Sequence, residues 1–111
     1  MRSKTEILQV ARKARGACPV LANLPTSTKN LALEGMAEAL IQSAPRLKKA
    51  NAIDVSSARK GGLSPAMIDR LTLSDRVLQG MANSLKEVAL LPDPVGQVNK
   101  MWKSPNGLWV G

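Results

Sequence analysis

The stretch Val88-Ala-Leu-Leu-Pro-Asp-Pro-Val-Gly-Gln-Val98, with Pro105-Asn-Gly-Leu108 after it, decides how this chain folds at its end. Pro92 stops the helical pattern that precedes it, because proline lacks the N–H that a helix needs and its ring clashes with the preceding turn. The four residues 104–107, Ser-Pro-Asn-Gly, suit a type I turn in order, and Gly107 can adopt the left-handed conformation of a bulged hairpin. The sequence therefore predicts a helix up to Pro92 and then a β-hairpin with strands at residues 97–103 and 108–110.

The bulged turn fixes the expected register of this hairpin, pairing Trp102 with Val110 and Lys103 with Trp109. That register sends the two indoles to opposite faces, so we expect one to pack on the helices and the other to stay exposed. An isolated two-stranded hairpin is marginally stable, and an open strand edge invites pairing with another chain. We therefore expect residues 97–111 to mediate a homo-oligomer, and the chain to be a fragment of something larger.

The segment before Pro92 has the clearest helical pattern in the chain. Ser74 is a good N-cap for a helix that begins at Asp75. Its inward stripe is Val77, Leu78, Met81, Ala82, Leu85, Val88 and Ala89. Further upstream, Ser64 and Pro65 predict a short helix that runs to about Leu71.

Two more helices are predicted at the N-terminus. Ser3 and Glu6 form a capping box for a helix over residues 4–15, and Gly16 ends it. A connector follows, in which we expect Cys18 to be a small apolar residue, and Thr26 then caps a second helix. The inward stripe of that helix is Leu33, Met36, Ala37, Leu40, Ile41 and Ala44.

A third helix opens at Pro45 and ends at Gly61-Gly62. Its expected inward residues are Leu47, Ala50, Ile53 and Ala58. Three cations, Arg46, Lys48 and Lys49, lie in its first turn, where the helix dipole disfavours positive charge. The dipole therefore leaves this basic cluster unexplained.

These patterns predict a mainly α chain of about five helices followed by a C-terminal β-hairpin. The 111 residues suffice for one domain, divided here into a helical part at residues 1–96 and the hairpin at 97–111. Apolar residues make up 44% of the chain and are almost all aliphatic, which suits helices packed through Ala, Leu, Val, Ile and Met. The longest apolar runs fall far short of the roughly 20 residues that span a bilayer, so we expect no membrane association.

The net charge of +8 is concentrated in the first half of the chain. Residues 1–60 hold eleven bases and four acids, a net +7, whereas residues 61–111 hold five bases and four acids, a net +1. Such a field could attract nucleic acid, an anionic membrane surface or a phosphorylated ligand. It could also belong to solvated helix faces that bind nothing, which is the ordinary role of such charges.

The chain offers little recognisable chemistry. Cys18 is its one cysteine and it has no histidine, so neither a disulfide nor a Cys/His metal cluster can form within it, and a reducing cytoplasm is the simplest compartment. No phosphate-binding loop or nucleophile motif is present. A catalytic role for Cys18 is disfavoured, because only Arg12, Lys13 and Arg15 are near enough in sequence to activate its thiol. We therefore assign no catalytic, cofactor-binding or metal-binding residue.

Five short motifs nevertheless resemble one enzyme family in order and spacing. The longest is Gly62-Leu-Ser-Pro-Ala-Met-Ile-Asp-Arg-Leu-Thr-Leu73, which matches the family pattern G-L-S-x-A-x-x-D-R-L-x-L. The others are Lys29-Asn30 with Ala32-Leu33, Ala50-Asn51 with Asp54 and Ala58, Val88-Ala89 with Leu91-Pro-Asp-Pro-Val-Gly96, and Trp102 with Pro105-Asn-Gly-Leu108. Together they are similar to the opening third of γ-glutamyl phosphate reductase, also called glutamate-5-semialdehyde dehydrogenase.

This resemblance implies the N-terminal helical layer of an α/β aldehyde-dehydrogenase-like fold, within the cofactor-binding domain, and the start of an oligomerisation hairpin. The implied enzyme reduces γ-glutamyl phosphate to glutamate-5-semialdehyde with NADPH in proline biosynthesis, through a cysteine-bound intermediate. In the family the catalytic cysteine and the nucleotide-binding sheet lie beyond the position of Gly111, and Cys18 does not match that cysteine. The resemblance thus implies a chain that is inactive alone and binds no NADP(H) by itself.

Two alternatives stay open from the residues alone. The first is a stand-alone basic helical module that binds nucleic acid, which rests only on the charge of residues 1–60. Such modules usually add aromatic stacking or a recognition motif, and both tryptophans lie in the other half, so we expect no specific nucleic-acid binding. The second is an independent dimerisation module that uses the hairpin.

Overall fold

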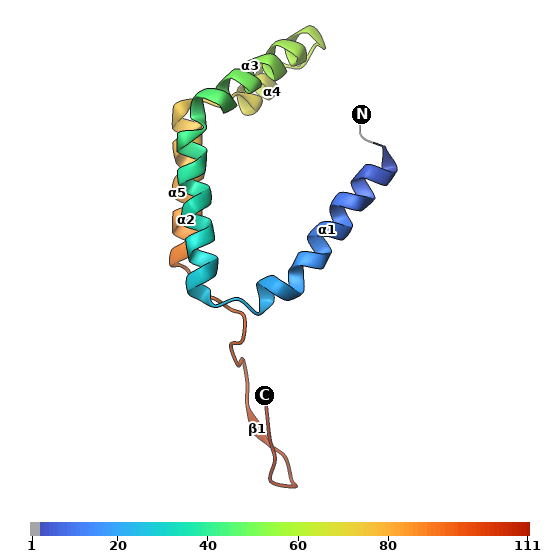
Figure 1. The fold of residues 1–111 in the computed structure, drawn as a ribbon, viewed down its shortest axis with the longest axis vertical. Coiled ribbons are helices and arrows are strands. Elements are labelled where there is room, and N and C mark those ends of the chain that lie inside the picture. The colour runs from blue at the N-terminus through green and yellow to red at the C-terminus, as the bar shows by residue number, and fades with distance from the viewer. Residues whose placement is uncertain (1–2) are drawn as a thin grey trace. The chain divides into compact units, whose positions relative to one another are not determined.

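The computed structural model describes residues 3–111 and contains, in that range, five helices and a two-stranded antiparallel sheet (Figure 1). The elements are α1 (Lys4–Ala22), α2 (Thr26–Gln42), α3 (Ala44–Lys60), α4 (Pro65–Leu71), α5 (Asp75–Leu90), β1 (Trp102–Lys103) and β2 (Trp109–Val110). The prediction of a mainly helical chain that ends in a β-hairpin is confirmed. The chain divides into two units, one of residues 27–91 and one that combines the chain up to Thr26 with Pro92–Gly111.

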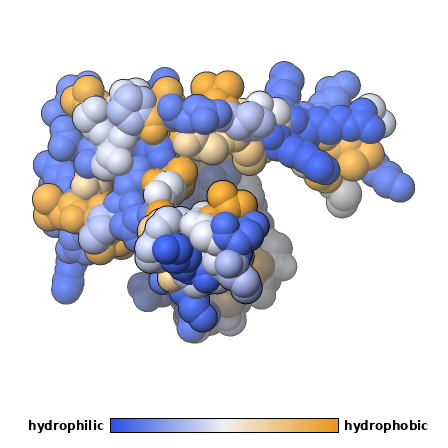
Figure 2. Space-filling view, turned by 90° about the horizontal axis from the view of Figure 1, so that it is seen from below, coloured by the Kyte–Doolittle hydropathy of each residue, from blue (hydrophilic) through white to orange (hydrophobic). Residues whose placement is uncertain are grey.

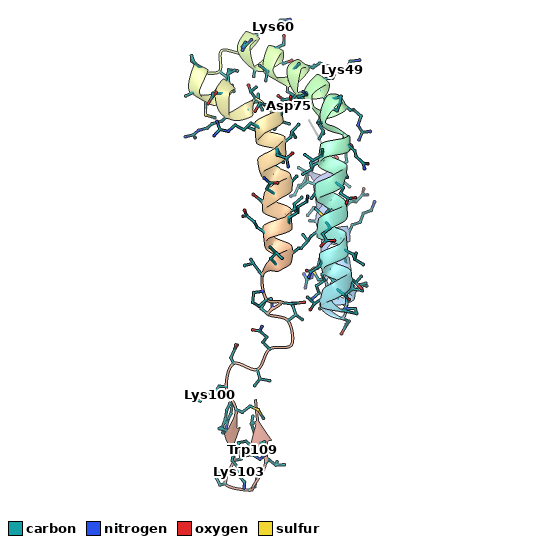
Figure 3. All side chains as sticks on the ribbon, turned by 90° about the vertical axis from the view of Figure 1, so that its left-hand side faces the viewer. Lys49, Lys60, Asp75, Lys100, Lys103 and Trp109 are labelled. Carbon is teal, nitrogen blue, oxygen red and sulfur yellow. The ribbon has the colours of Figure 1, made fainter. Side chains whose placement is uncertain are left out.

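The unit of residues 27–91 is built on α2 and α5, which run side by side in opposite directions (Figures 1 and 3). Ala37 of α2 and Ala82 of α5 are completely buried, and Leu78 of α5 is 1% exposed. An alanine side chain is a single methyl group, so it is readily buried between two neighbouring helices. These residues make up the larger part of the small core of this unit.

The rest of this core lies at the corner between α3 and α4, where Val55 and Ile68 are buried. Asn51 of α3 is buried with them and forms two hydrogen bonds to the segment between α4 and α5. Its Nδ2 donates to the Leu71 carbonyl at 2.9 Å, and its Oδ1 accepts from the Leu73 N–H at 2.8 Å. A buried asparagine with both side-chain groups bonded fixes the position of that segment on α3.

The predicted inward face of α3 was wrong in part. Leu47 and Ala58 are half-buried as expected, but Ala50 and Ile53 are exposed, and Asn51 and Val55 take the buried positions. Residues 47, 51, 55 and 58 form one stripe at helical spacing, so the helix is rotated relative to the prediction. A pattern of apolar residues alone could not find this face, because one of its central residues is polar.

Three predicted helix starts are confirmed by their capping contacts. Ser3 and Glu6 form the reciprocal box, with Ser3 Oγ accepting from the Glu6 N–H at 3.3 Å and Glu6 Oε2 from the Ser3 N–H at 2.7 Å. The Ser64 side chain accepts from the Met67 N–H, and the Ser74 side chain from the Val77 N–H. Each contact satisfies an N–H that the helix itself leaves without a partner.

The predicted end of the first helix was wrong. Helix α1 continues through Gly16 and Pro19 to Ala22, and Asn23 is its C-cap, donating from Nδ2 to the Pro19 carbonyl at 2.8 Å. A single glycine within a helix costs only about 1 kcal/mol relative to alanine, which the surrounding helix formers can offset. Cys18 consequently lies on α1 and is exposed, instead of lying in a connector.

Thr26 likewise differs from its predicted role as a cap. It is the first residue of α2, and its hydroxyl donates to Asp93 Oδ2 at 2.8 Å. The two residues are 67 positions apart in sequence, so this bond ties the start of α2 to the segment that follows α5. Asp93 also accepts from the Val95 N–H at 3.0 Å, which shapes the turn after Pro92.

The hairpin has the predicted register, with Trp102 opposite Val110 and Lys103 opposite Trp109. Gly107 has φ of 88°, which is the left-handed conformation that the bulged turn requires. The first strand is shorter than expected, since β1 comprises only Trp102 and Lys103. Trp102 is 49% exposed and Trp109 66%.

Candidate functional site

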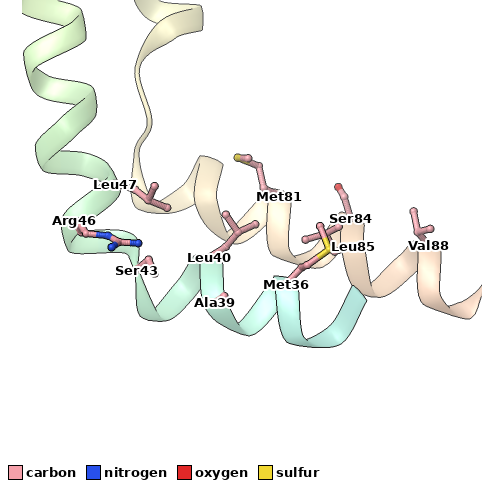
Figure 4. A pocket seen from close by; sticks show the side chains of 10 residues that line it. All are labelled: Met36, Ala39, Leu40, Ser43, Arg46, Leu47, Met81, Ser84, Leu85 and Val88. Carbon is pink, nitrogen blue, oxygen red and sulfur yellow. The ribbon is translucent and has the colours of Figure 1, made fainter. Parts of the chain in front are cut away.

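An open groove of about 710 Å³ runs along α2 and α5 in the described part of the chain (Figure 4). It extends from the middle of α2 and the last turn of α5 to the start of α3, and all of its lining residues belong to the unit of residues 27–91. The lining residues are Met36, Ala39, Leu40, Ser43, Arg46, Leu47, Met81, Ser84, Leu85 and Val88. We call this feature the α2/α5 groove.

The α2/α5 groove arises because the two apolar stripes are wider than the contact between the helices. Ala37, Leu78 and Ala82 close the seam, whereas Met36, Met81 and Val88 lie beside it and are 54%, 43% and 49% exposed. The sequence predicted every one of these residues as core. The prediction of burial is correct for the three seam residues. It is wrong for the three residues beside the seam, which no described residue covers.

The lining of the α2/α5 groove carries a charged side chain at one end only. Among the described residues that line it, Arg46 is the one charged side chain. Lys48, two residues further along, forms an ion pair with Asp75, with Nζ 2.7 Å from Oδ1, and this contact joins the N-terminal part of α3 to the first residue of α5. The basic cluster that the helix dipole could not explain is therefore divided: Lys48 is paired, Arg46 borders the groove and Lys49 is exposed.

The groove does not fit a nicotinamide dinucleotide. Its lining is aliphatic apart from Ser43, Ser84 and Arg46, and the described residues place neither a glycine-rich phosphate loop nor a carboxylate for a ribose in it. Within residues 3–111, no group of three or more Cys, Asp or Glu side chains is arranged to hold a metal ion. The thiol of Cys18 donates to the Ala14 carbonyl at 3.6 Å, a local contact within α1 that gives it no catalytic partner.

Further apolar surface lies outside the groove. Helix α1 buries none of its residues within Lys4–Ala22, and Ile7, Val20 and Leu21 are more than half exposed. Figure 2 shows such surface as orange side chains among blue hydrophilic ones. No helix in the described part of the chain is long and apolar enough to cross a membrane.

Comparison with known proteins accounts for this architecture. The chain is 46% identical to the γ-glutamyl phosphate reductase of Halothermothrix orenii over all of its 111 residues, and 49% identical to that of Geobacter metallireducens over 106 residues. The crystal structure of γ-glutamyl phosphate reductase from Thermotoga maritima superimposes with a TM-score of 0.87 over 94% of the chain, at 38% identity. No family model matches the chain.

The fold is thus similar to the helical N-terminal region of a solved reductase. More particularly, the chain is homologous to the N-terminal part of γ-glutamyl phosphate reductase, as its sequence motifs indicated. It spans about a quarter of the length of the relatives it matches: 27% of the Halothermothrix protein, and 25% of both the Geobacter protein and the Thermotoga chain.

Proposed function

We propose that this chain forms the N-terminal helical part of the cofactor-binding domain of an NADPH-dependent γ-glutamyl phosphate reductase. The reaction is the conversion of γ-glutamyl phosphate to glutamate-5-semialdehyde in proline biosynthesis, by a cytoplasmic enzyme of the aldehyde dehydrogenase superfamily. The observation that carries this proposal is the 46% identity to a reductase over the whole chain. Homology at that level, together with a TM-score of 0.87 to a solved reductase, supports a shared role and not only a shared fold.

We further propose that the 111 residues neither bind NADP(H) nor turn over substrate by themselves. The apolar α2/α5 groove does not suit a dinucleotide, and the Cys18 thiol contacts the Ala14 carbonyl of its own helix in a chain that has no histidine to serve as its base. The role of these residues in the reductase is therefore structural: they supply a helical layer on which the rest of the domain packs.

The test is a reductase assay of the purified chain with γ-glutamyl phosphate and NADPH, beside the Thermotoga maritima reductase as a positive control. We expect NADPH consumption by the control only, and no rise in the melting temperature of the chain at millimolar NADPH. A rise that Cys18→Ser abolishes, or turnover by the chain alone, would overturn the proposed inactivity.

A second candidate role is homo-oligomerisation through residues 97–111. The hairpin leaves Trp102, Leu108 and Trp109 between 49% and 66% exposed, and each strand has a partner on one side only. An unpaired strand edge beside exposed indoles favours edge-to-edge pairing with a second copy. Light scattering should show a dimer or larger species, and deletion of the residues after Gly96 should return the chain to a monomer. A monomeric full chain whose tryptophans are both shielded from a soluble quencher would contradict this role.

A further inference from the structure

A second hollow, of about 290 Å³, opens where α3 meets the connection between α4 and α5, and it shares no lining residue with the α2/α5 groove. Four of its lining residues on α3 are Lys48, Ala52, Val55 and Arg59. They follow one another at i, i+4, i+7 and i+11, so they form one stripe along the helix. We call this cavity the α3 hollow.

The α3 hollow has a cation at each end and no carboxylate in its lining. Lys48 and Arg59 are 11 residues apart on one helix, which corresponds to about 16 Å along the helix axis. Ala52 and Val55 lie between them, and Leu73 lines the hollow from the α4–α5 connection. The hollow therefore combines two positive ends with an aliphatic middle, an arrangement that suits a small elongated ligand.

Two polar residues in the lining are already committed to the fold. Asn51 uses both groups of its side-chain amide on the α4–α5 connection, and the Thr72 hydroxyl donates to the Ile68 carbonyl at 2.7 Å. Ser56 also lines the hollow and lies one turn before Arg59 on α3. The donors left for a ligand are thus the two cations and the Ser56 hydroxyl.

Both cations keep donors for a ligand. The Lys48 ammonium has three N–H groups, its side chain is 39% exposed, and its one ion pair is with Asp75. Arg59 forms no ion pair with any residue in the range 3–111, and a guanidinium can hold a carboxylate through two parallel hydrogen bonds. The helix dipole accounts for a cation at the end of α3, where Arg59 lies, and does not account for Lys48 near its start.

We propose that the α3 hollow binds a small linear dicarboxylate, with one carboxylate at Arg59 and the other at Lys48. The Ser56 hydroxyl donates to the first carboxylate, and the aliphatic chain of the ligand lies over Ala52. A carboxylate suits the Lys48 end better than a phosphate, because the Asp75 carboxylate beside it repels a group of charge near −2 more strongly than one of charge −1. This binding site does not rest on the proposed function.

The experiment titrates the full chain with adipate and, as the matched monoanion, with hexanoate, at low ionic strength. Binding is followed by the NMR shifts of the backbone amides of α3. We expect adipate to bind at least about tenfold more tightly than hexanoate, because its second carboxylate gains a charged hydrogen bond. Arg59→Gln should weaken adipate binding at least about tenfold for the same reason. Lys60→Gln is the matched control, since it removes the same charge next to the hollow but outside its lining.

A second pair of variants tests the aliphatic middle without a change of charge. Ala52→Leu should fill the hollow and abolish adipate binding, whereas Ala50→Leu, on α3 but outside the lining, should leave it unchanged. All four variants replace exposed residues, so unchanged helicity in circular dichroism confirms that they fold. Absence of adipate binding, or equal affinity for hexanoate, would overturn the proposal. So would equal weakening by the two members of either pair, because the binding would then reflect general charge or general bulk on α3.

Discussion

Asn51 shows most clearly what one residue contributes to this fold. It is a polar side chain among the buried residues of the chain, and it holds the α4–α5 connection through the Leu71 carbonyl and the Leu73 N–H. From the sequence, Asn51 was recognised only as part of a family motif, without a structural role. The reason is that a pattern of apolar residues predicts which apolar side chains are buried. It cannot predict a buried amide, because the hydrogen-bond partners of Asn51 lie 20 and 22 positions away in sequence.

The substitution Asn51→Ala should therefore lower the free energy of unfolding by more than the small loss of side-chain volume suggests. The substitution leaves the Leu71 carbonyl and the Leu73 N–H without their side-chain partner, and we expect the free energy of unfolding to fall by about 1–3 kcal/mol. Asn83→Ala is the control: Asn83 is exposed on α5, where it accepts from Gln79 Nε2 at 3.0 Å, and its replacement should cost no more than about 0.5 kcal/mol. Urea unfolding followed by circular dichroism measures both, and equal costs would contradict a special role for Asn51.

At the scale of elements, helix starts were predictable and helix ends were less so. Ser3, Ser64 and Ser74 cap helices where the sequence placed them, because a cap depends on three or four neighbouring residues only. Gly16 was expected to end α1, but glycine stops a helix when it adopts positive φ, as Gly62 does just after α3 with φ of 81°. The local sequence does not show which of these two glycines adopts a positive φ, whereas the backbone conformation of each shows it directly.

These two glycines make a matched pair for substitution by alanine. A Cβ at either position would meet no atom within 4 Å, so the only difference is the backbone conformation. Gly16→Ala should raise the helicity of α1, with a gain of about 0.5–1 kcal/mol in helix stability. Gly62→Ala should instead lower the unfolding midpoint, at a cost of about 1–2 kcal/mol for the left-handed conformation. Circular dichroism and urea unfolding separate these outcomes, and a destabilising Gly16→Ala would mean that α1 does not continue through residue 16.

For the whole molecule, the sequence predicted the elements, the hairpin register and the family, but not the groove. The stripes of α2 and α5 show that a face is apolar, and they do not show how much of it the neighbouring helix covers. Ala37 and Ala82 close the seam while Met36 and Met81 stay open, a division that depends on how the two helices are rotated about their axes. Likewise, the charge pattern could not reveal that Lys48 pairs with Asp75.

The net charge of +8 leads to the last prediction, which concerns nucleic acid. Arg12, Lys13 and Arg15 lie exposed on α1, and such cations neutralise phosphates without reading bases. We expect weak binding to duplex DNA that is equal for two unrelated sequences and falls steeply with salt. Replacing all three by glutamine should make the dependence of log affinity on log salt shallower, by about 0.9 for each phosphate that is no longer neutralised. Fluorescence anisotropy over a salt series measures this, and sequence-selective binding that survives salt well above physiological strength would instead favour a nucleic-acid-binding module.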